Sequence, residues 1–274
     1  MKKRWFHLIK VTFLSIFSLM MIYPLYWLIT SSFKSNEEFF AEPYAFPTSI
    51  SWGNFTRAWE VADLGTAMIN SVIVTVSATA LTVFLGALTA YVLSRFTFRL
   101  KAFLMVFFLL GMLIPIHSTL VPLFTMMNQV GLLDTYWALI LPYTAFELPI
   151  AIFLTVAYMS SIPKDLEEAA VIDGTGYWGI FFRIMLPLSV PALSTVAILS
   201  FLRYWNEFVF ALVFINDNSL KTLPLSLSIF SDGFSTDYAL TMAAMTIAVI
   251  PTIIMYLLFQ EQIMKGMVAG SVKG

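Results

Sequence analysis

The stretch VTFLSIFSLMMIYPLYWLITSSF, residues 11–33, decides the fold. It has no charged side chain between Lys10 and Lys34, and its length suits one helix across about 30 Å of membrane hydrocarbon. Five further apolar stretches follow, each bounded by charged residues, and they predict helices over 68–93, 102–126, 136–158, 189–214 and 238–260. The sequence therefore predicts an all-α integral membrane protein with six transmembrane helices.

The composition of the 274 residues supports a membrane location, because 59% of them are hydrophobic and only 11% are charged. With a mean hydropathy of +0.86, too few charges remain to cover a soluble globule. The net charge of −1 and the lack of a long basic block argue against a nucleic-acid partner. The absence of cysteine excludes disulfides, thiolate catalysis and cysteine-ligated metals.

Lysine and arginine resist translocation, so their distribution predicts the orientation of the chain. With the N-terminus inside, eleven of the 15 lie in inner segments, while Lys34, Arg57 and Lys221 lie outside and Arg203 falls within a span. The eleven are Lys2, Lys3, Arg4, Lys10, Arg95, Arg99, Lys101, Lys164, Arg183, Lys265 and Lys273. Both termini are therefore predicted to be cytoplasmic. A cleaved signal peptide is the alternative for the first span, but that stretch is long and ends without a small-x-small cleavage site.

The inner loop after the fourth predicted span, residues 160–188, is unusually polar for this chain. Its early acidic residues suit the positive end of a helix dipole, and Gly174 suits the left-handed turn that ends a helix. We predict a helix-turn-helix in which Leu166 and the pair Ala169-Ala170 form one packing face beside Glu167-Glu168. Such a face favours a protein partner. The alternative, a helix lying on lipid headgroups, is disfavoured by the excess of acidic residues.

The same loop carries a spaced motif: Glu168-Ala169-Ala170, three residues, Gly174, nine residues, Ile184, one residue, then Leu186-Pro187. It resembles the EAA loop of bacterial ABC-importer permeases at every named position. From about Asn70 to Lys273 the chain is similar to the smaller permease of carbohydrate importers, the maltose-transporter type. The further matching segments are Asn70-Ser71, Arg95-Phe96-Thr97-Phe98, Trp205-Asn206-Glu207-Phe208, Thr222-Leu223-Pro224 and the ending from Gly266 to Gly274.

The resemblance implies the type I ABC-importer permease fold. Residues 1–67 would then hold a cytoplasmic segment, the first helix and an extracytoplasmic loop, residues 68–260 the permease core, and residues 261–274 a cytoplasmic tail. It also implies a bacterial cytoplasmic (inner) membrane protein that is not an enzyme and binds no cofactor. A partner ATPase would use the ATP and Mg.

The implied partners are a homologous second permease, two copies of a cytoplasmic ABC ATPase, and an extracytoplasmic sugar-binding protein that docks on outer loops, including 216–237. In that family the EAA loop sits in a cleft of the ATPase and transmits its closure. Glu168 would be the acidic contact, Gly174 the turn and Pro187 the end of the unit. The residues expected to couple to the ATPase are Glu167, Glu168, Ala169, Ala170, Asp173, Gly174, Ile184, Leu186 and Pro187.

Four ionisable residues fall within predicted spans, namely His117, Glu147, Arg203 and Glu207. Each costs about 2.5–3.5 kcal/mol at the membrane centre if it is unpaired. Arg203 and Glu207 are four positions apart, so one helical face can pair them, with Asn206 alongside. This face either lines the translocation pathway or the seam with the partner permease, or it only bridges the bundle. The candidate pathway residues are Glu147, Arg203, Trp205, Asn206 and Glu207.

Other functions fit the sequence less well. Residues 174–179 match the dinucleotide fingerprint G-x-G-x-x-G, but no strand or βαβ unit surrounds them, and no P-loop occurs in the chain. An ion-coupled secondary transporter with buried Glu and Arg residues is the main alternative, although such a carrier needs no docking loop. A channel filter and a catalytic cluster are both missing from the sequence.

Overall fold

A computed structural model describes the backbone of residues 2–231 and 237–271, and the side chains of residues 6–230 and 237–260. Within these ranges every regular element is a helix. The chain divides into two compact units. Unit 1 comprises residues 1–65 and 226–251, and unit 2 comprises residues 66–225 and 252–274.

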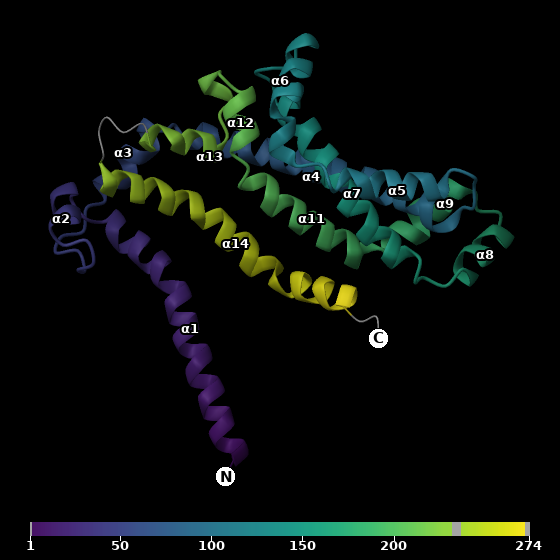
Figure 1. Cartoon of the computed structure of the whole chain (residues 1–274), viewed down its shortest axis with the longest axis horizontal. Helices are drawn as coiled ribbons and strands as arrows, with labels where there is room; N and C mark the ends of the chain where they lie inside the picture. The colour runs from purple at the N-terminus through teal and green to yellow at the C-terminus, as the bar shows by residue number, and fades with distance from the viewer. Residues whose placement is uncertain (1, 232–236, 272–274) are drawn as a thin grey trace. The chain divides into compact units, whose positions relative to one another are not determined.

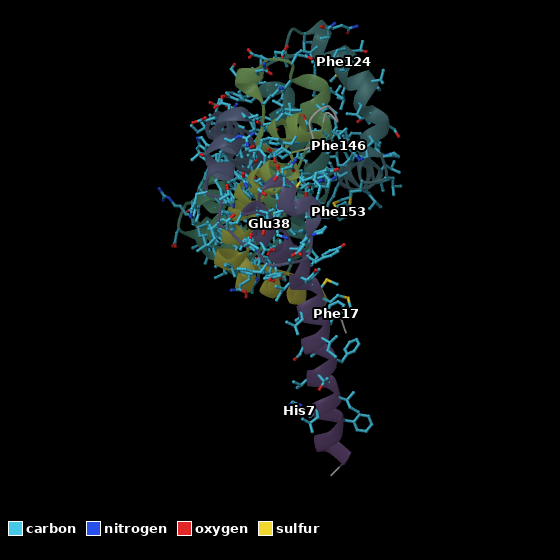
Figure 2. The ribbon with its side chains drawn as sticks, turned by 90° about the vertical axis from the view of Figure 1, so that its left-hand side faces the viewer. His7, Phe17, Glu38, Phe124, Phe146 and Phe153 are labelled. Carbon is cyan, nitrogen blue, oxygen red and sulfur yellow. The ribbon has the colours of Figure 1, made fainter. Side chains whose placement is uncertain are left out.

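Unit 1 contains a long apolar helix followed by a small folded segment. The helix α1 (Lys2–Ser32) has no buried residue in its most apolar window. The side chains of His7 and Phe17 project outward from it (Figure 2). A helix that is apolar on all faces suits contact with lipid. The other helices of the unit are α2 (Asn36–Ala41), α3 (Gly53–Val61), the 3-10 helix η4 (Leu227–Ser231) and the start of α14 (Tyr238–Ser271).

A fully buried lysine holds the segment after α1 together. The Lys34 ammonium donates to the carbonyls of Glu42 at 2.8 Å and Pro43 at 3.0 Å. The Asn54 amide at the start of α3 donates to the carbonyls of Ser32 at 2.9 Å and Lys34 at 2.8 Å. These bonds satisfy carbonyls that no helix uses, so the loop between α1 and α3 has a fixed fold.

Unit 2 is a bundle of longer helices joined by short ones (Figure 1). Its elements, some of which extend into unit 1, are α4 (Leu64–Arg95), α5 (Lys101–Gly111), η1 (Ile116–Thr119), α6 (Leu120–Gln129), α7 (Trp137–Met159), α8 (Asp165–Ile172), α9 (Tyr177–Ile180), η2 (Phe181–Met185), α10 (Leu186–Leu188), α11 (Val190–Trp205), α12 (Val209–Phe214), η3 (Asn218–Leu220) and α13 (Leu223–Ser226).

Close packing of α4 on α7 forms the centre of unit 2. A Cβ added at Gly86 of α4 would lie 3.2 Å from the Cβ of Ala151 on α7, so a small residue is needed there. The Thr144 hydroxyl of α7 donates to the Ala78 carbonyl of α4 at 3.4 Å. A buried cluster that includes Ala78, Tyr143 and Phe214 joins both helices to α12.

Four of the six expected spans are present as single helices, and the third and fifth are broken. In the described part of the chain, four helical stretches are long and apolar enough to cross a membrane: Phe6–Ser32, Leu64–Arg95, Trp137–Met159 and Tyr238–Gln260. Two further candidates are bent pairs, Lys101–Gly111 with Ile116–Gln129 at 94° and Tyr177–Leu188 with Val190–Trp205 at 73°. If each bent pair is one span, the number rises to six.

The third and fifth predicted spans are therefore not single straight helices. The third is interrupted before η1, where Pro115 has no N–H to continue the hydrogen-bond ladder. In the fifth, α11 ends at Trp205 and α12 begins at Val209. The predicted tail, 261–274, begins inside α14, which continues to Ser271, whereas 272–274 lie outside the described residues. A hydropathy pattern locates apolar length and cannot locate these breaks.

Replacing Lys34 by methionine is expected to loosen the segment between α1 and α3. Each of the two carbonyls that Lys34 binds would lose one charged hydrogen bond, worth about 1–3 kcal/mol, and would keep only its second donor, the Ala45 N–H for Glu42 and Nε1 of Trp27 for Pro43. Limited proteolysis of the purified protein should then cut residues 36–52 faster than in the wild type. The matched control is Arg57→Met, because Arg57 is exposed and its ion pair with Asp237, 3.3 Å long, contributes little. Equal cleavage of both variants would contradict the role given to Lys34.

Candidate functional site

The polar loop between α7 and α11 folds as the predicted helix-turn-helix. α8 forms the first arm, and α9, η2 and α10 run on as the second. η2 is a π-helix, a rare form that frequently occurs at functional sites. Figure 1 shows α8 and α9 together at one end of unit 2, on the right of the view. Residues 160–188, the segment predicted to couple to an ATPase, are called the coupling loop from here on.

Gly174 ends α8 with a left-handed turn, as predicted, at φ +80°. The Thr175 N–H donates to the Ala170 carbonyl at 2.9 Å and the Gly174 N–H donates to the Val171 carbonyl at 3.0 Å. This pair of bonds is the Schellman motif, which satisfies the last carbonyls of a helix. No atom lies within 4 Å of an added Cβ, so the backbone conformation alone requires glycine here.

The two adjacent glutamates of α8 have different surroundings. Glu167 turns inward, and its Oε1 lies 2.6 Å from Nε of Arg95 at the end of α4. Their side chains are 15% and 5% exposed. Burial raises the pKa of the Glu167 carboxyl, and the nearby Arg95 and Lys164 offset this only in part. Glu168 is exposed, so of the two glutamates this one is available to a partner.

Arg95 is a residue of this site that the sequence did not identify as functional. Besides Glu167, it donates through Nη2 to the Ile162 carbonyl at 2.9 Å and to Sδ of Met185 at 3.7 Å. In the sequence, Arg95 belonged to the matching segment Arg95-Phe96-Thr97-Phe98. It was otherwise used only as one of the positive charges that predict the orientation of the chain.

The alanine pair does not form one face with Leu166, which corrects the predicted packing. Ala170 is buried in a cluster with Tyr91, Phe181 and Met185, whereas Ala169 is exposed. Successive residues of a helix point about 100° apart, so an adjacent pair divides between core and surface. The exposed apolar side chains of α8 are Leu166, Val171 and Ile172, at 46%, 56% and 85% exposure.

The remaining predicted coupling residues divide between the exposed surface and the buried side of the loop. Asp173 is exposed and caps α8, and Pro187 is exposed near the end of the loop. Ile184 and Leu186 are partly buried and pack on the cluster around Ala170. A cavity of about 510 Å³ lies between the end of α4 and the two arms. Its lining includes Arg95, Lys164, Glu167, Glu168, Ile172 and Tyr177.

The charged residues of the apolar helices pair differently from the prediction. Arg203 does not pair with Glu207; its Nη1 donates to Oε2 of Glu147 on α7 at 2.8 Å. Glu207 accepts instead from the Tyr143 hydroxyl at 2.6 Å and from the Phe210 N–H at 2.9 Å. The reason is the break after Trp205, which takes Glu207 out of the helical register of Arg203.

A second cavity, of about 320 Å³, opens at this helix break. Its lining includes Arg203, Asn206 and Glu207 from the predicted pathway set, together with His117, Tyr143 and Phe146. Two members of the predicted set do not line it. Trp205 is buried and stacks on Phe201 with ring centroids 5.7 Å apart, and Glu147 is buried beneath Arg203. Over the described ranges, no group of three or more His, Asp or Glu side chains could hold a metal ion.

Comparison with known proteins gives consistent similarities. Residues 82–268 match the model of a family described as "Binding-protein-dependent transport system inner membrane component". The chain is 44% identical to the probable ABC transporter permease protein YurM of Bacillus subtilis, over 96% of this chain and 87% of that protein. It is 37% identical to the diacetylchitobiose uptake system permease protein NgcG of Streptomyces coelicolor, over 98% and 88%.

A solved structure shares the fold. It is a chain of a bacterial ABC transporter involved in the import of the acidic polysaccharide alginate. The TM-score is 0.84 at 23% sequence identity, with 95% of this chain and 97% of that chain covered. The broken helices of unit 2 thus belong to an observed membrane-protein architecture.

Substitutions at Gly174 are expected to destabilise the coupling loop in the order Asn, Ala, Val. A side chain in the left-handed region costs about 1–2 kcal/mol, less for Asn and more for a β-branched residue. Thermal unfolding and protease sensitivity of the loop in detergent measure the order. Gly176→Ala is the matched control, because Gly176 has φ −76° and open space around it. A control as destabilised as Gly174→Val would contradict the backbone explanation.

Breaking the Arg203–Glu147 pair is expected to cost more than removing it. Arg203→Gln leaves the buried Glu147 carboxyl without its cation, at a cost of about 1–3 kcal/mol, less than for a fully buried pair because Arg203 is 47% exposed. The double variant Arg203→Gln with Glu147→Gln should regain most of this, because no charge is left buried. Thermal unfolding in detergent measures the single and double variants. Simple additivity of the two single substitutions would show that the pair is not coupled.

Proposed function

Because this chain belongs to the family of binding-protein-dependent transport system inner membrane components, we propose that it forms half of the membrane pathway of an ATP-driven sugar importer. It is a multi-pass protein of the cytoplasmic membrane. A sugar or oligosaccharide substrate is supported by the similarity to the Streptomyces permease of a diacetylchitobiose uptake system. The other half of the pathway would be a second, homologous permease.

The observation that carries the proposal is the exposed face of α8. Val171 and Ile172, three and four positions after the exposed acid Glu168, stand on the same side of a short helix that the Schellman turn fixes in place. A face that combines apolar side chains with one charge suits a groove in a folded partner better than a lipid surface. We assign that groove to a cytoplasmic ABC ATPase, of which two copies would serve the two permeases.

In this mechanism the chain transmits movement and performs no reaction. ATP and Mg are held by the ATPase subunits, and their closure moves the coupling loop. Glu168 contacts the ATPase, Gly174 sets the angle between the two arms, and Pro187 lies where the second arm approaches the 73° bend into α11. The bend turns a displacement of the loop into a displacement of α11, because a helix moves as a rigid rod.

The cavity at the break between α11 and α12 is the proposed part of the sugar pathway. Arg203 and Asn206 are exposed there although both come from an apolar helix. Charged and polar side chains at such depth face a water-filled route or another protein, because lipid cannot hydrogen-bond them. Trp205 has no contact with this cavity, so the proposed pathway residues are Arg203, Asn206 and Glu207, with Glu147 supporting Arg203.

Sugar would be delivered by an extracytoplasmic binding protein, in keeping with the name of the family. Its proposed docking surface includes the loop 216–237, of which residues 232–236 lie outside the described part. With that loop outside, both termini are cytoplasmic, as the lysine and arginine distribution predicts. The C-terminal tail would reach the ATPase as well.

The alternative of an ion-coupled carrier is not favoured. A proton carrier needs an acid that can exchange its proton, whereas Glu147 is bonded to Arg203 and Glu207 accepts three hydrogen bonds, from the Tyr143 hydroxyl and from the N–H groups of Phe210 and Ala211. A secondary carrier of this kind also needs no cytoplasmic partner, so it leaves the exposed apolar residues of α8 unexplained.

Reversing the charge of Glu168 is expected to separate this chain from its ATPase. Glu168→Lys should reduce both co-purification of the ATPase and sugar uptake by about tenfold or more, because a like charge would face the partner's cation. Uptake is measured in cells that carry the complete transport system. The control is Asp165→Lys, an exposed acid in the first turn of the same helix. If Glu168→Lys assembles and transports like the control, the docking proposal is wrong.

A further inference from the structure

Arg95 joins three parts of the chain that lie apart in the sequence: the end of α4, the first arm of the coupling loop and η2. It is the last residue of α4, its side chain is 5% exposed, and its contacts reach three other places. They are the Ile162 carbonyl before α8, the Glu167 carboxylate within α8, and Sδ of Met185 in η2. One guanidinium therefore touches both arms of the coupling loop.

Aromatic contacts extend this attachment around the end of α4. Tyr91 packs on Phe181 of η2 with ring centroids 5.3 Å apart, and Phe96 packs edge-on against Tyr177 of α9 at 5.3 Å. The Tyr91 hydroxyl donates to the Tyr177 carbonyl at 3.4 Å. These contacts and those of Arg95 attach the loop to α4, although the chain connects the loop only to α7 and α11.

Only arginine suits this position. Its guanidinium is a rigid planar fork with five donors, so it can serve a carboxylate and a carbonyl in different directions at once. Lysine would present a single ammonium on a flexible stem. The Nε–Oε1 contact is short, but the two groups are not aligned as a hydrogen bond. The ion pair is therefore weaker than a bidentate arginine–carboxylate pair.

The energetics of the pair fit positioning better than stabilisation. A buried ion pair often adds nothing to stability over apolar residues of the same size, because both charges lose their hydration. What the pair does supply is a fixed geometry between α4 and α8, since neither charge can leave the other without a large cost.

We propose that Arg95 is a positioning residue that fastens α4 to the coupling loop through Glu167, so that α4 moves with α8 when the ATPase moves. This rests on the proposed function, since it assumes that an ATPase drives the loop. It divides the two glutamates by role: Glu168 meets the ATPase, and Glu167 passes the movement on within this chain. α4 packs closely on α7 through Gly86, so the movement reaches the centre of unit 2.

The test measures coupling separately from assembly, in the complete transporter reconstituted in liposomes. Glu167→Gln keeps an oxygen that can accept from Arg95 but removes the charge. We expect normal assembly with the ATPase and normal ATP hydrolysis, while the sugar imported per ATP falls about tenfold, within the usual range for coupling between sites. Asp165→Asn, which removes an exposed acid of the same helix, should transport like the wild type.

A second variant guards against a folding defect. Arg95→Met with Glu167→Met removes both buried charges together, so neither is left unpaired and the loop should still assemble. We expect the same loss of sugar per ATP as for Glu167→Gln. Wild-type coupling in either variant overturns the proposal, and so does a loss of uptake that only follows a loss of assembled complex. If the wild-type complex itself hydrolyses ATP without importing sugar, the proposed function fails instead.

Discussion

A charged side chain inside a membrane has to find its partner within the protein, and this constraint governs the arrangement of unit 2. Arg203 reaches across to Glu147 on α7, and Glu207 receives the Tyr143 hydroxyl and the Phe210 N–H. The bond from the Phe210 N–H to Glu207 satisfies a backbone donor in the first turn of α12, which has no partner within that helix. An apolar span can therefore be interrupted without exposing bare backbone to lipid, and the interruption opens the cavity lined by Arg203 and Asn206.

The coupling loop follows the same rule at the other end of the bundle. One acid of α8 turns inward to Arg95 and the next stays exposed, so adjacent glutamates serve different contacts. The Gly174 turn and the buried Ala170 fix the first arm, and the π-helix of the second arm lies against Tyr91. The result is a rigid element whose outer face is free for a partner and whose inner face is bound to α4. The proposed coupling depends on this construction, because a rigid element transmits a displacement that a flexible connection would absorb.

Patterns within one stretch of sequence predicted much of this, and pairings between distant stretches could not be predicted. Apolar length gave the candidate spans, and a glycine after an acidic helix gave the turn at Gly174. The Arg203–Glu207 pairing failed because helical spacing was assumed to continue through a break that no single residue marks. The true partners lie on α7, 56 residues away for Arg203 and 64 for Glu207. Arg95 and Lys34 were counted only as charges for the same reason, since their roles depend on carbonyls that folding brings close.

The central claim is that the exposed face of α8 meets a cytoplasmic ATPase, and the chain's lack of cysteine allows a direct measurement. Ile172, at 85% exposure, can be replaced by cysteine to give this chain a single thiol. Thiol-directed cross-linking in membranes that hold the complete transporter then identifies the neighbour. The account predicts one main product that joins this chain to the ATPase subunit. Cross-linking to the extracytoplasmic binding protein, or modification from outside intact cells by a membrane-impermeant reagent, would contradict it.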